Sequence, residues 1–164
     1  MKDLPATQTV PLQAVTEYLW AEADMLDARD YDRWLGLWAE GGHYVIPVEK
    51  EGDDFANQLN IAYDDATMRE MRVRRLQGGF SISAAPPAES VRTLSRFVME
   101  EVDETTLKVR AAQHVVEDKF GRQRVFAANV EWVLKVTDEG LMIRDKVIRL
   151  LNSDGMLTSI SYLF

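Results

Sequence analysis

The chain has 164 residues, of which 46% are hydrophobic and 28% charged, and this composition is typical of one folded domain over residues 1–164. A net charge of −8 opposes binding to nucleic acid or to an anionic membrane surface, because both need clustered Lys and Arg. The lack of cysteine excludes disulfides, thiolate nucleophiles and iron–sulfur ligation by this chain.

Two helices are predicted over residues 10–40. Apolar residues recur every three or four positions from Leu12 to Leu26, the period of an amphipathic helix, with acidic residues such as Glu22 between them. Asp30 is placed to cap a second helix, which should end at Gly41-Gly42. The segment HYVIPV then indicates a short strand, with its proline at an edge or at the strand's end.

Residues 49–63 have no regular period and are expected to form a loop or an arm. A third helix is predicted over residues 64–77, because Asp64 and Asp65 can cap its start. The Gly78-Gly79 pair that follows is a helix stop.

Residues 90–164 are predicted to form a sheet. Four β-type runs, listed here by range, are separated by turn candidates: 90–102, 105–120, 123–136 and 141–151. Apolar residues alternate from Phe126 to Val136, so one face of the sheet should be buried. Strands of about fourteen residues span roughly 45 Å and must twist and curl. The sequence therefore predicts an α+β fold with helices on one side of a curved sheet.

Acid–base chemistry is one hypothesis for this fold, because a curled sheet under helices can enclose a pocket. The candidate groups are Asp27, Asp30, Tyr31, His43 and His114. A structural interpretation competes with it: Asp27 and Asp30 can cap and stabilise a helix start, and each histidine can be structural. The two histidines lack metal-ligand spacing, so the sequence gives little support for a metal site.

Several segments together resemble the small (beta) subunit of aromatic-ring-hydroxylating dioxygenases. They are EADMLDARDYDRWLGLWAEGGHYVIPV, YDDATMREMRVRRLQGG, two prolines before a basic strand, and MIRDKVIRLL, and their order matches over residues 14–164. The resemblance implies the cone-like α+β fold of ketosteroid isomerase, scytalone dehydratase and nuclear transport factor, with helices on a long, strongly curved mixed sheet. One departure is PPAESVRTLSRF, where Ala88 and Glu89 delay the first basic residue to Arg92.

The resemblance also implies a division of labour between subunits. The family's large (alpha) subunit carries a Rieske two-iron two-sulfur cluster and a mononuclear non-haem iron, so we expect no catalytic, cofactor or metal residue in this chain. Three alpha and three beta subunits commonly assemble. The residues that the resemblance places at subunit contacts are Arg72, Arg74, Arg75, Pro86, Pro87, Arg92, Arg144 and Lys146.

We therefore expect a non-catalytic beta subunit that stabilises a dioxygenase of aromatic catabolism and helps to shape substrate choice. No apolar segment has the length of a signal peptide core or a membrane span, so a cytoplasmic location is expected. One alternative is a separate cone-fold dehydratase, hydratase or isomerase that uses the candidate acid–base residues named above. Another is a module that binds a small ligand, which needs the cavity but no acid–base pair.

Overall fold

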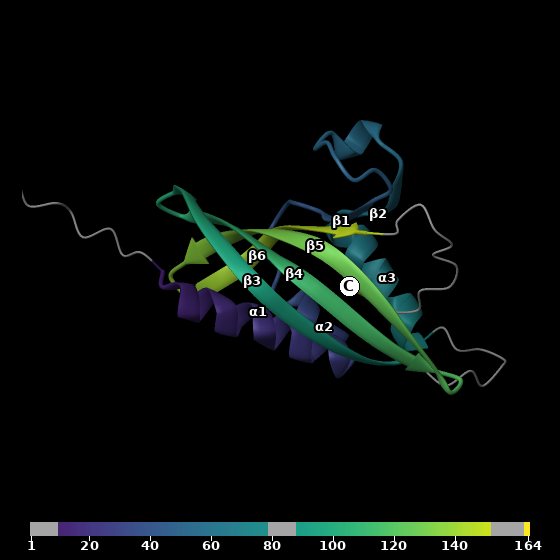
Figure 1. Cartoon of the computed structure of the whole chain (residues 1–164). Coiled ribbons are helices and arrows are strands. Elements are labelled where there is room, and N and C mark those ends of the chain that lie inside the picture. The colour runs from purple at the N-terminus through teal and green to yellow at the C-terminus, as the bar shows by residue number, and fades with distance from the viewer. Residues whose placement is uncertain (1–9, 79–87, 152–162) are drawn as a thin grey trace, which may run out of the picture.

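Helices come first along the chain and long strands follow, in residues 10–78, 88–151 and 163–164, which the computed structural model describes. The helices are α1 (Leu12–Asp27), α2 (Tyr31–Leu35), the short 3-10 helix η1 (Phe55–Asn57) and α3 (Ala66–Gly78). The strands are β1 (Tyr44–Pro47), β2 (Asn60–Asp64), β3 (Glu89–Asp103), β4 (Thr106–Lys119), β5 (Arg122–Thr137) and β6 (Gly140–Leu150). Figure 1 shows this arrangement.

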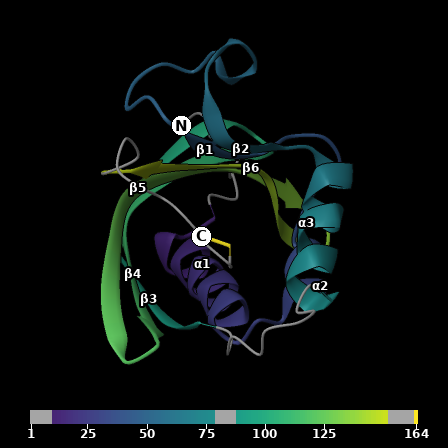
Figure 2. The same ribbon diagram turned by 90° about the vertical axis from the view of Figure 1, so that its right-hand side faces the viewer.

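The six strands of the described chain form one mixed sheet in the order β2-β1-β6-β5-β4-β3. Neighbouring strands are antiparallel except β1 and β6, which pair in parallel with Tyr44 opposite Lys146. The sheet curls around α1, while α2 and α3 lie beside its open side (Figure 2). The predicted α+β fold with a curved mixed sheet is confirmed.

The segment between β1 and β2 differs from its prediction. The interpretation of residues 49–63 as a loop or an arm was wrong for their last part, because Asn60–Asp64 form β2 and pair with β1. Before β2, the chain projects from the face of the sheet that is opposite to α1 (Figure 1). Five residues are too few for apolar and polar side chains to show a reliable alternation, so β2 is recognised only by its pairing with β1.

The second helix is shorter than predicted. It ends at Leu35 rather than near Gly41, because the following backbone hydrogen-bonds to β6. Ile143 N donates to Leu37 O at 2.7 Å, and Ala39 N donates to Ile143 O at 2.8 Å. These bonds replace helical bonds, so residues 37–39 fasten the end of α2 to the sheet.

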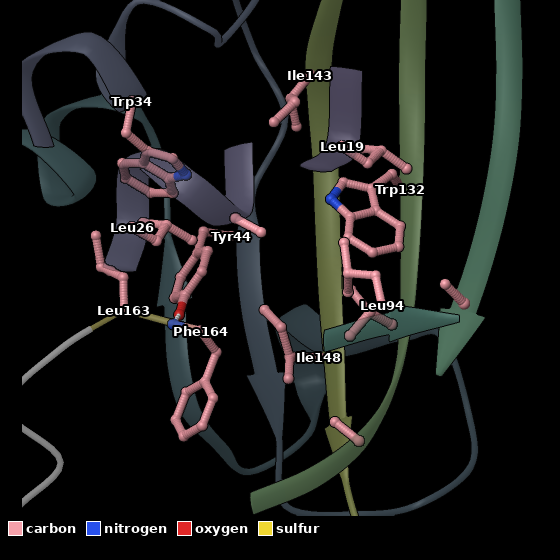
Figure 3. Packing of buried hydrophobic residues seen from close by; sticks show 14 of the residues in the cluster. Leu19, Leu26, Trp34, Tyr44, Leu94, Trp132, Ile143, Ile148, Leu163 and Phe164 are labelled. Carbon is pink, nitrogen blue, oxygen red and sulfur yellow. Dashed lines mark hydrogen bonds between the residues drawn. The ribbon is translucent and has the colours of Figure 1, made fainter. Parts of the chain in front are cut away.

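The hydrophobic core fills the space between α1 and the concave face of the sheet. Helix α1 contributes Val15, Leu19 and Leu26, which are all buried. Trp34 from α2 packs edge-on against Tyr44 of β1, with ring centroids 5.9 Å apart. Figure 3 shows Leu19, Leu26, Trp34 and Tyr44 in this core together with Trp132 of β5. Each such buried apolar side chain contributes about 1.5 to 3 kcal/mol to stability, so the core fixes the helices on the sheet.

Candidate functional site

A buried carboxylate, Glu22 of α1, lies at the centre of the cone interior. Its Oε1 accepts a hydrogen bond from Trp132 Nε1 at 3.0 Å. Its Oε2 accepts from Trp34 Nε1 at 2.9 Å and from Lys146 Nζ at 2.9 Å. The side chains of Glu22 and Lys146 are only 2% and 1% exposed. This carboxylate therefore joins α1, α2, β5 and β6 at a single point.

Lys146 is the cation of this interior cluster. Burial lowers the pKa of Lys146 below its ordinary value, and the charge of Glu22 opposes that shift. Its ammonium group also donates to Phe164 O at 2.8 Å. A buried pair of this kind contributes little net stability when intact, but losing one partner leaves an uncompensated charge.

A second ion pair holds the C-terminal end of α1. Asp27 is the last residue of that helix, and its carboxylate accepts hydrogen bonds from Arg92 Nη1, from Arg92 N at 2.8 Å and from Ser90 Oγ at 2.9 Å. The Arg92 side chain is 1% exposed. Tyr31 is buried near this pair; burial raises the pKa of its hydroxyl, and the charge of Arg92 opposes the shift. Asp27 thus connects α1 to β3.

The inner end of the described chain, Leu163–Phe164, also lies in the interior. Arg92 Nη2 donates to Leu163 O, and Phe164 N donates to Tyr44 Oη at 2.9 Å. The Phe164 ring meets the Phe126 ring edge-on, with centroids 5.6 Å apart. With the bond from Lys146 Nζ to Phe164 O, the contacts of this segment therefore come from β1, β3, β5 and β6.

A groove of about 340 Å³ lies on the opposite side of the sheet, between η1 and strands β4, β5 and β6. His43 and Tyr63 stack in it with ring centroids 4.4 Å apart and an interplanar angle of 5°. His43 is positioned by its backbone N, which donates to Asp145 Oδ1 at 2.9 Å. The remaining lining residues are Val45, Asp53, Asp54, Phe55, Ala56, Lys108, Glu131, Val133 and Val147.

Gly42 sets the path of the chain into this groove. Its φ of +72° is in the left-handed region, and a Cβ atom there would lie 1.9 Å from Arg144 O. Only glycine permits both the dihedral angle and the close approach to β6. The Gly41-Gly42 pair was predicted as a helix stop, but α2 ends six residues earlier at Leu35, and the pair instead places His43 against the sheet.

The acid–base candidates do not form one group. Asp27 and Tyr31 lie in and beside the interior, whereas Asp30 is near the surface with Arg33 as its ion-pair partner at 3.4 Å. His43 lies in the groove across the sheet. His114 is exposed on β4, between inward-facing neighbours. Proton transfer needs groups within hydrogen-bond reach of one substrate, and these five residues are spread over separate surfaces.

The predicted contact residues also divide. Arg74 and Arg75 are exposed on α3, and Arg144 is partly exposed beside Asp145. Arg72 forms a bidentate pair with the buried Asp64, and that hydrogen-bonded pair raises the pKa of the guanidinium. The two remaining basic candidates, Arg92 and Lys146, lie in the interior, where their side chains are buried within this chain. Pro86 and Pro87 lie outside the described residues.

Two charged residues of the helices, Glu22 and Arg69, are buried although no burial was predicted for them. Glu22 was interpreted as part of the polar face of the first helix, yet it lies three residues after Leu19 and four before Leu26, on the apolar stripe. Arg69 of α3 is 2% exposed and its guanidinium lies 3.9 Å from the centroid of the Trp38 ring. Helical spacing from buried Val73 gives the same signal for Arg69. A charged residue on the apolar stripe of a helix is therefore the sequence pattern that indicates a buried charge.

Across residues 10–78, 88–151 and 163–164, no three His, Cys, Asp or Glu side chains are grouped so that they could hold a metal ion. Among the helices described here, none has the length and apolar character needed to cross a membrane.

Comparison with known proteins agrees with the geometry. The structure superposes on the beta subunit of the benzoate 1,2-dioxygenase from Burkholderia mallei with a TM-score of 0.79 at 19% identity, covering 94% of this chain and 99% of that one. An NTF2-like protein from Novosphingobium aromaticivorans gives a TM-score of 0.57 at 16% identity, covering 85% and 81%. Helices on the concave side of a curved mixed sheet thus define a member of the cone-like α+β class.

Sequence comparison identifies the family within that class. The family model described as ring hydroxylating beta subunit matches residues 21–154. The small subunit of anthranilate 1,2-dioxygenase from Acinetobacter baylyi is 24% identical over 144 residues, which are 85% of this chain and 88% of that protein. The chain belongs to the ring hydroxylating beta subunit family, as its sequence segments predicted.

Proposed function

We propose that this chain is a non-catalytic beta subunit that stabilises a multicomponent aromatic-ring-hydroxylating dioxygenase. The observation that carries the proposal is that the charged side chains of the cone interior are held in ion pairs. Glu22 pairs there with Lys146, and Asp27 pairs with Arg92, and both pairs connect helices to strands. Groups held in such pairs support a scaffold, whereas catalysis needs a group facing a substrate.

The proposed partner is the alpha subunit of the same oxygenase, in an assembly of three alpha and three beta subunits. Family membership supports this partner, and the names of relatives support an aromatic substrate class: anthranilate, benzoate and benzene. We place the assembly in the cytoplasm, in the catabolism of aromatic compounds, with an effect of the beta subunit on substrate choice.

The expected cofactors do not fit this chain. A Rieske cluster takes two Cys and two His ligands, and a mononuclear non-haem iron takes two His and a carboxylate. The sequence has no Cys and two His, and these two lie in the groove and on the exposed side of β4. We therefore assign the Rieske cluster and the iron to the alpha subunit.

One face of α3 is the proposed contact surface. Met68 and Met71 are 46% and 56% exposed, and Arg75 follows at the spacing that places it on the same face. Methionine and arginine are enriched at protein interfaces, and exposed apolar side chains gain from being covered. Arg74 lies nearby and forms an ion pair with Glu70 at 2.5 Å on the surface.

Co-purification with the alpha subunit tests the proposal. We expect the two chains to co-elute, and we expect the alpha subunit alone to be less stable or less active. A chain with Met71→Glu and Arg75→Glu should bind the alpha subunit at least tenfold more weakly, since about 1.4 kcal/mol corresponds to one decade. The control is Arg122→Glu, another exposed arginine, on the β4–β5 hairpin.

Two results would contradict these assignments separately. If the parent chain does not associate with the alpha subunit, or if alpha alone has full activity and stability, the proposed function is wrong. If the parent associates but the double variant binds as tightly as the Arg122→Glu control, only the contact surface is wrong.

A further inference from the structure

The segment Leu163–Phe164 is positioned inside the cone like a bound ligand. Its two residues are 1% and 0% exposed. Figure 2 places this end of the chain within the curve of the sheet, beside α1, and Figure 3 shows Phe164 next to Tyr44. The interior of the cone is therefore occupied by residues that lie more than ten positions beyond the last strand, β6.

Three strands supply polar groups to the backbone of this segment. Lys146 Nζ of β6 donates to Phe164 O at 2.8 Å, and Arg92 Nη2 of β3 donates to Leu163 O. Tyr44 Oη of β1 accepts from Phe164 N at 2.9 Å. Two donors and one acceptor thus recognise the main chain, which leaves side-chain recognition to the apolar surroundings.

The two cations can hold this segment while they keep their own carboxylates. An ammonium group has three N–H donors and a guanidinium group has five. Lys146 donates to Glu22 and to Phe164 O, and Arg92 donates through Nη1 to Asp27 and through Nη2 to Leu163 O. The ion pairs therefore hold the donors in place before any ligand arrives.

The aromatic part of the segment has a matching surface. The Phe164 ring packs edge-on against Phe126 of β5, with an interplanar angle of 77°. Edge-on packing of this kind is favourable because of the ring quadrupoles. An apolar recess with a few converging polar groups is the usual form of a small-molecule site.

We propose that the interior bounded by Tyr44, Arg92, Phe126 and Lys146 is a binding site for a small aromatic molecule that carries an oxygen acceptor, and that Leu163–Phe164 occupy this site in cis. The acceptor is a carbonyl or a carboxylate oxygen. Occupation by the chain itself closes the interior to other aromatic molecules. This property goes beyond the proposed scaffold function and does not depend on the alpha subunit.

Supply of the segment in trans is the first test. A chain shortened by Leu163 and Phe164 should lose thermal stability, and millimolar N-acetyl-Leu-Phe-amide should raise its Tm again. N-acetyl-Leu-Ala-amide should not, because it lacks the ring. N-acetyl-Leu-Phe with a free carboxylate identifies the preferred acceptor. Stronger stabilisation by the amide indicates a neutral oxygen acceptor, and stronger stabilisation by the acid indicates an anionic one. Stabilisation by either supports the proposal.

A full-length variant provides the second test and does not require the shortened chain to fold. Phe164→Ala keeps the backbone contacts and removes the ring, so Tm should fall by roughly 10 °C. Toluene should restore part of this loss by filling the space that the ring vacates. The control is Phe120→Ala, because Phe120 is 69% exposed; its Tm should not respond to toluene.

Two results would overturn the proposal. One is a Tm of Phe164→Ala equal to that of Phe120→Ala, which would mean that the ring has no buried site. The other is a loss of stability in the shortened chain that neither Leu-Phe peptide reverses, together with a loss in Phe164→Ala that toluene does not reverse. That result would make Leu163–Phe164 ordinary core residues without a ligand-binding site.

Discussion

The cone interior and the groove at His43 lie on opposite faces of one sheet, and they use charged and aromatic residues differently. In the interior, Glu22 holds two indole N–H groups and an ammonium group, all within 3.0 Å. In the groove, His43 stacks on Tyr63 beside charged residues in an open space of about 340 Å³. The same residue types therefore form a rigid structural cluster on one face and an accessible surface on the other.

Burial explains why these two regions should respond differently to mutation. A charge in the interior has lost its hydration and depends on its partner, so removing the partner is costly. A charge at the groove retains water, which screens its interactions and replaces lost contacts. Mutations can therefore test this difference, and the expected losses of stability decrease from the interior to the groove.

The largest effect is expected for Glu22→Ala. This change leaves Lys146 buried without its carboxylate and removes the acceptor of two indole N–H groups. We expect a loss of about 3 to 5 kcal/mol in the free energy of unfolding, measured by urea denaturation. Glu17→Ala is the matched control, because Glu17 is exposed on the same helix. Equal losses in both variants would show that the interior cluster has no special role.

Asp27→Asn should have the next largest effect. The substitution removes the negative charge beside the buried guanidinium of Arg92 and weakens the link from α1 to β3. We expect a loss of about 2 kcal/mol, also from urea denaturation. Asp24→Asn, at an exposed position of α1, is the control. A wild-type unfolding curve for Asp27→Asn would mean that this pair is not needed to hold the helix end.

Alkaline pH should reveal the burial of Tyr44. Burial raises the pKa of Tyr44 above its ordinary value of 10.0, while its hydrogen bond to Phe164 N and the charges of Arg72 and Arg92 oppose the shift. The unfolded chain then releases this proton first, so the stability contribution is complete below pH 10.0 and is lost as the pH rises above it.

The measurement compares slopes of stability against pH. Each such tyrosine contributes up to about 1.4 kcal/mol per pH unit, so Tyr44→Phe should have the shallower slope above pH 10.0. Burial also raises the pKa of Tyr18 and Tyr31, and both remain in parent and variant. The lowered pKa of Lys146 acts in the opposite direction below its ordinary value of 10.5. Identical slopes would mean that Tyr44 ionises freely in the folded protein.

The smallest effects are expected for the histidines. His43→Ala removes a stacked ring at the groove and should cost about 1 kcal/mol, and His114→Ala removes an exposed side chain and should cost less than about 0.5 kcal/mol. Neither change should alter turnover per assembled oxygenase. A hundredfold loss of turnover with intact assembly would support the acid–base hypothesis instead and would reverse the contrast between interior and groove.

Local sequence patterns predicted most of the fold. Alternation from Phe126 to Leu134 placed those side chains on the concave face, and the long runs of β-type residues required a curled sheet. Helical spacing from Leu12 to Leu26 corresponds to α1. These patterns succeed because side-chain direction along a helix or a strand is fixed by the local backbone. The short strand β2 was missed because its hydrogen bonds come from β1.

The candidate site was predicted less well than the fold. The residue types of the acid–base candidates can be read from the sequence, but the face on which each lies and its hydrogen-bond partners cannot. His43 and Asp27 are close in sequence, yet one lies in the groove and the other in the interior ion pair. Lys146 and Arg92 were expected at a subunit contact, whereas both donate hydrogen bonds inside the cone.

The sequence by itself determined the helices, the long strands, the class of fold and the family, because these depend on periodicity and on the order of segments. Only the tertiary structure decided which charges are buried and what they bind. Glu22 and Lys146 are 124 positions apart, and Tyr44 and Phe164 are 120 apart. No local pattern can record such contacts, since they form only when the sheet curls and brings distant strands around α1.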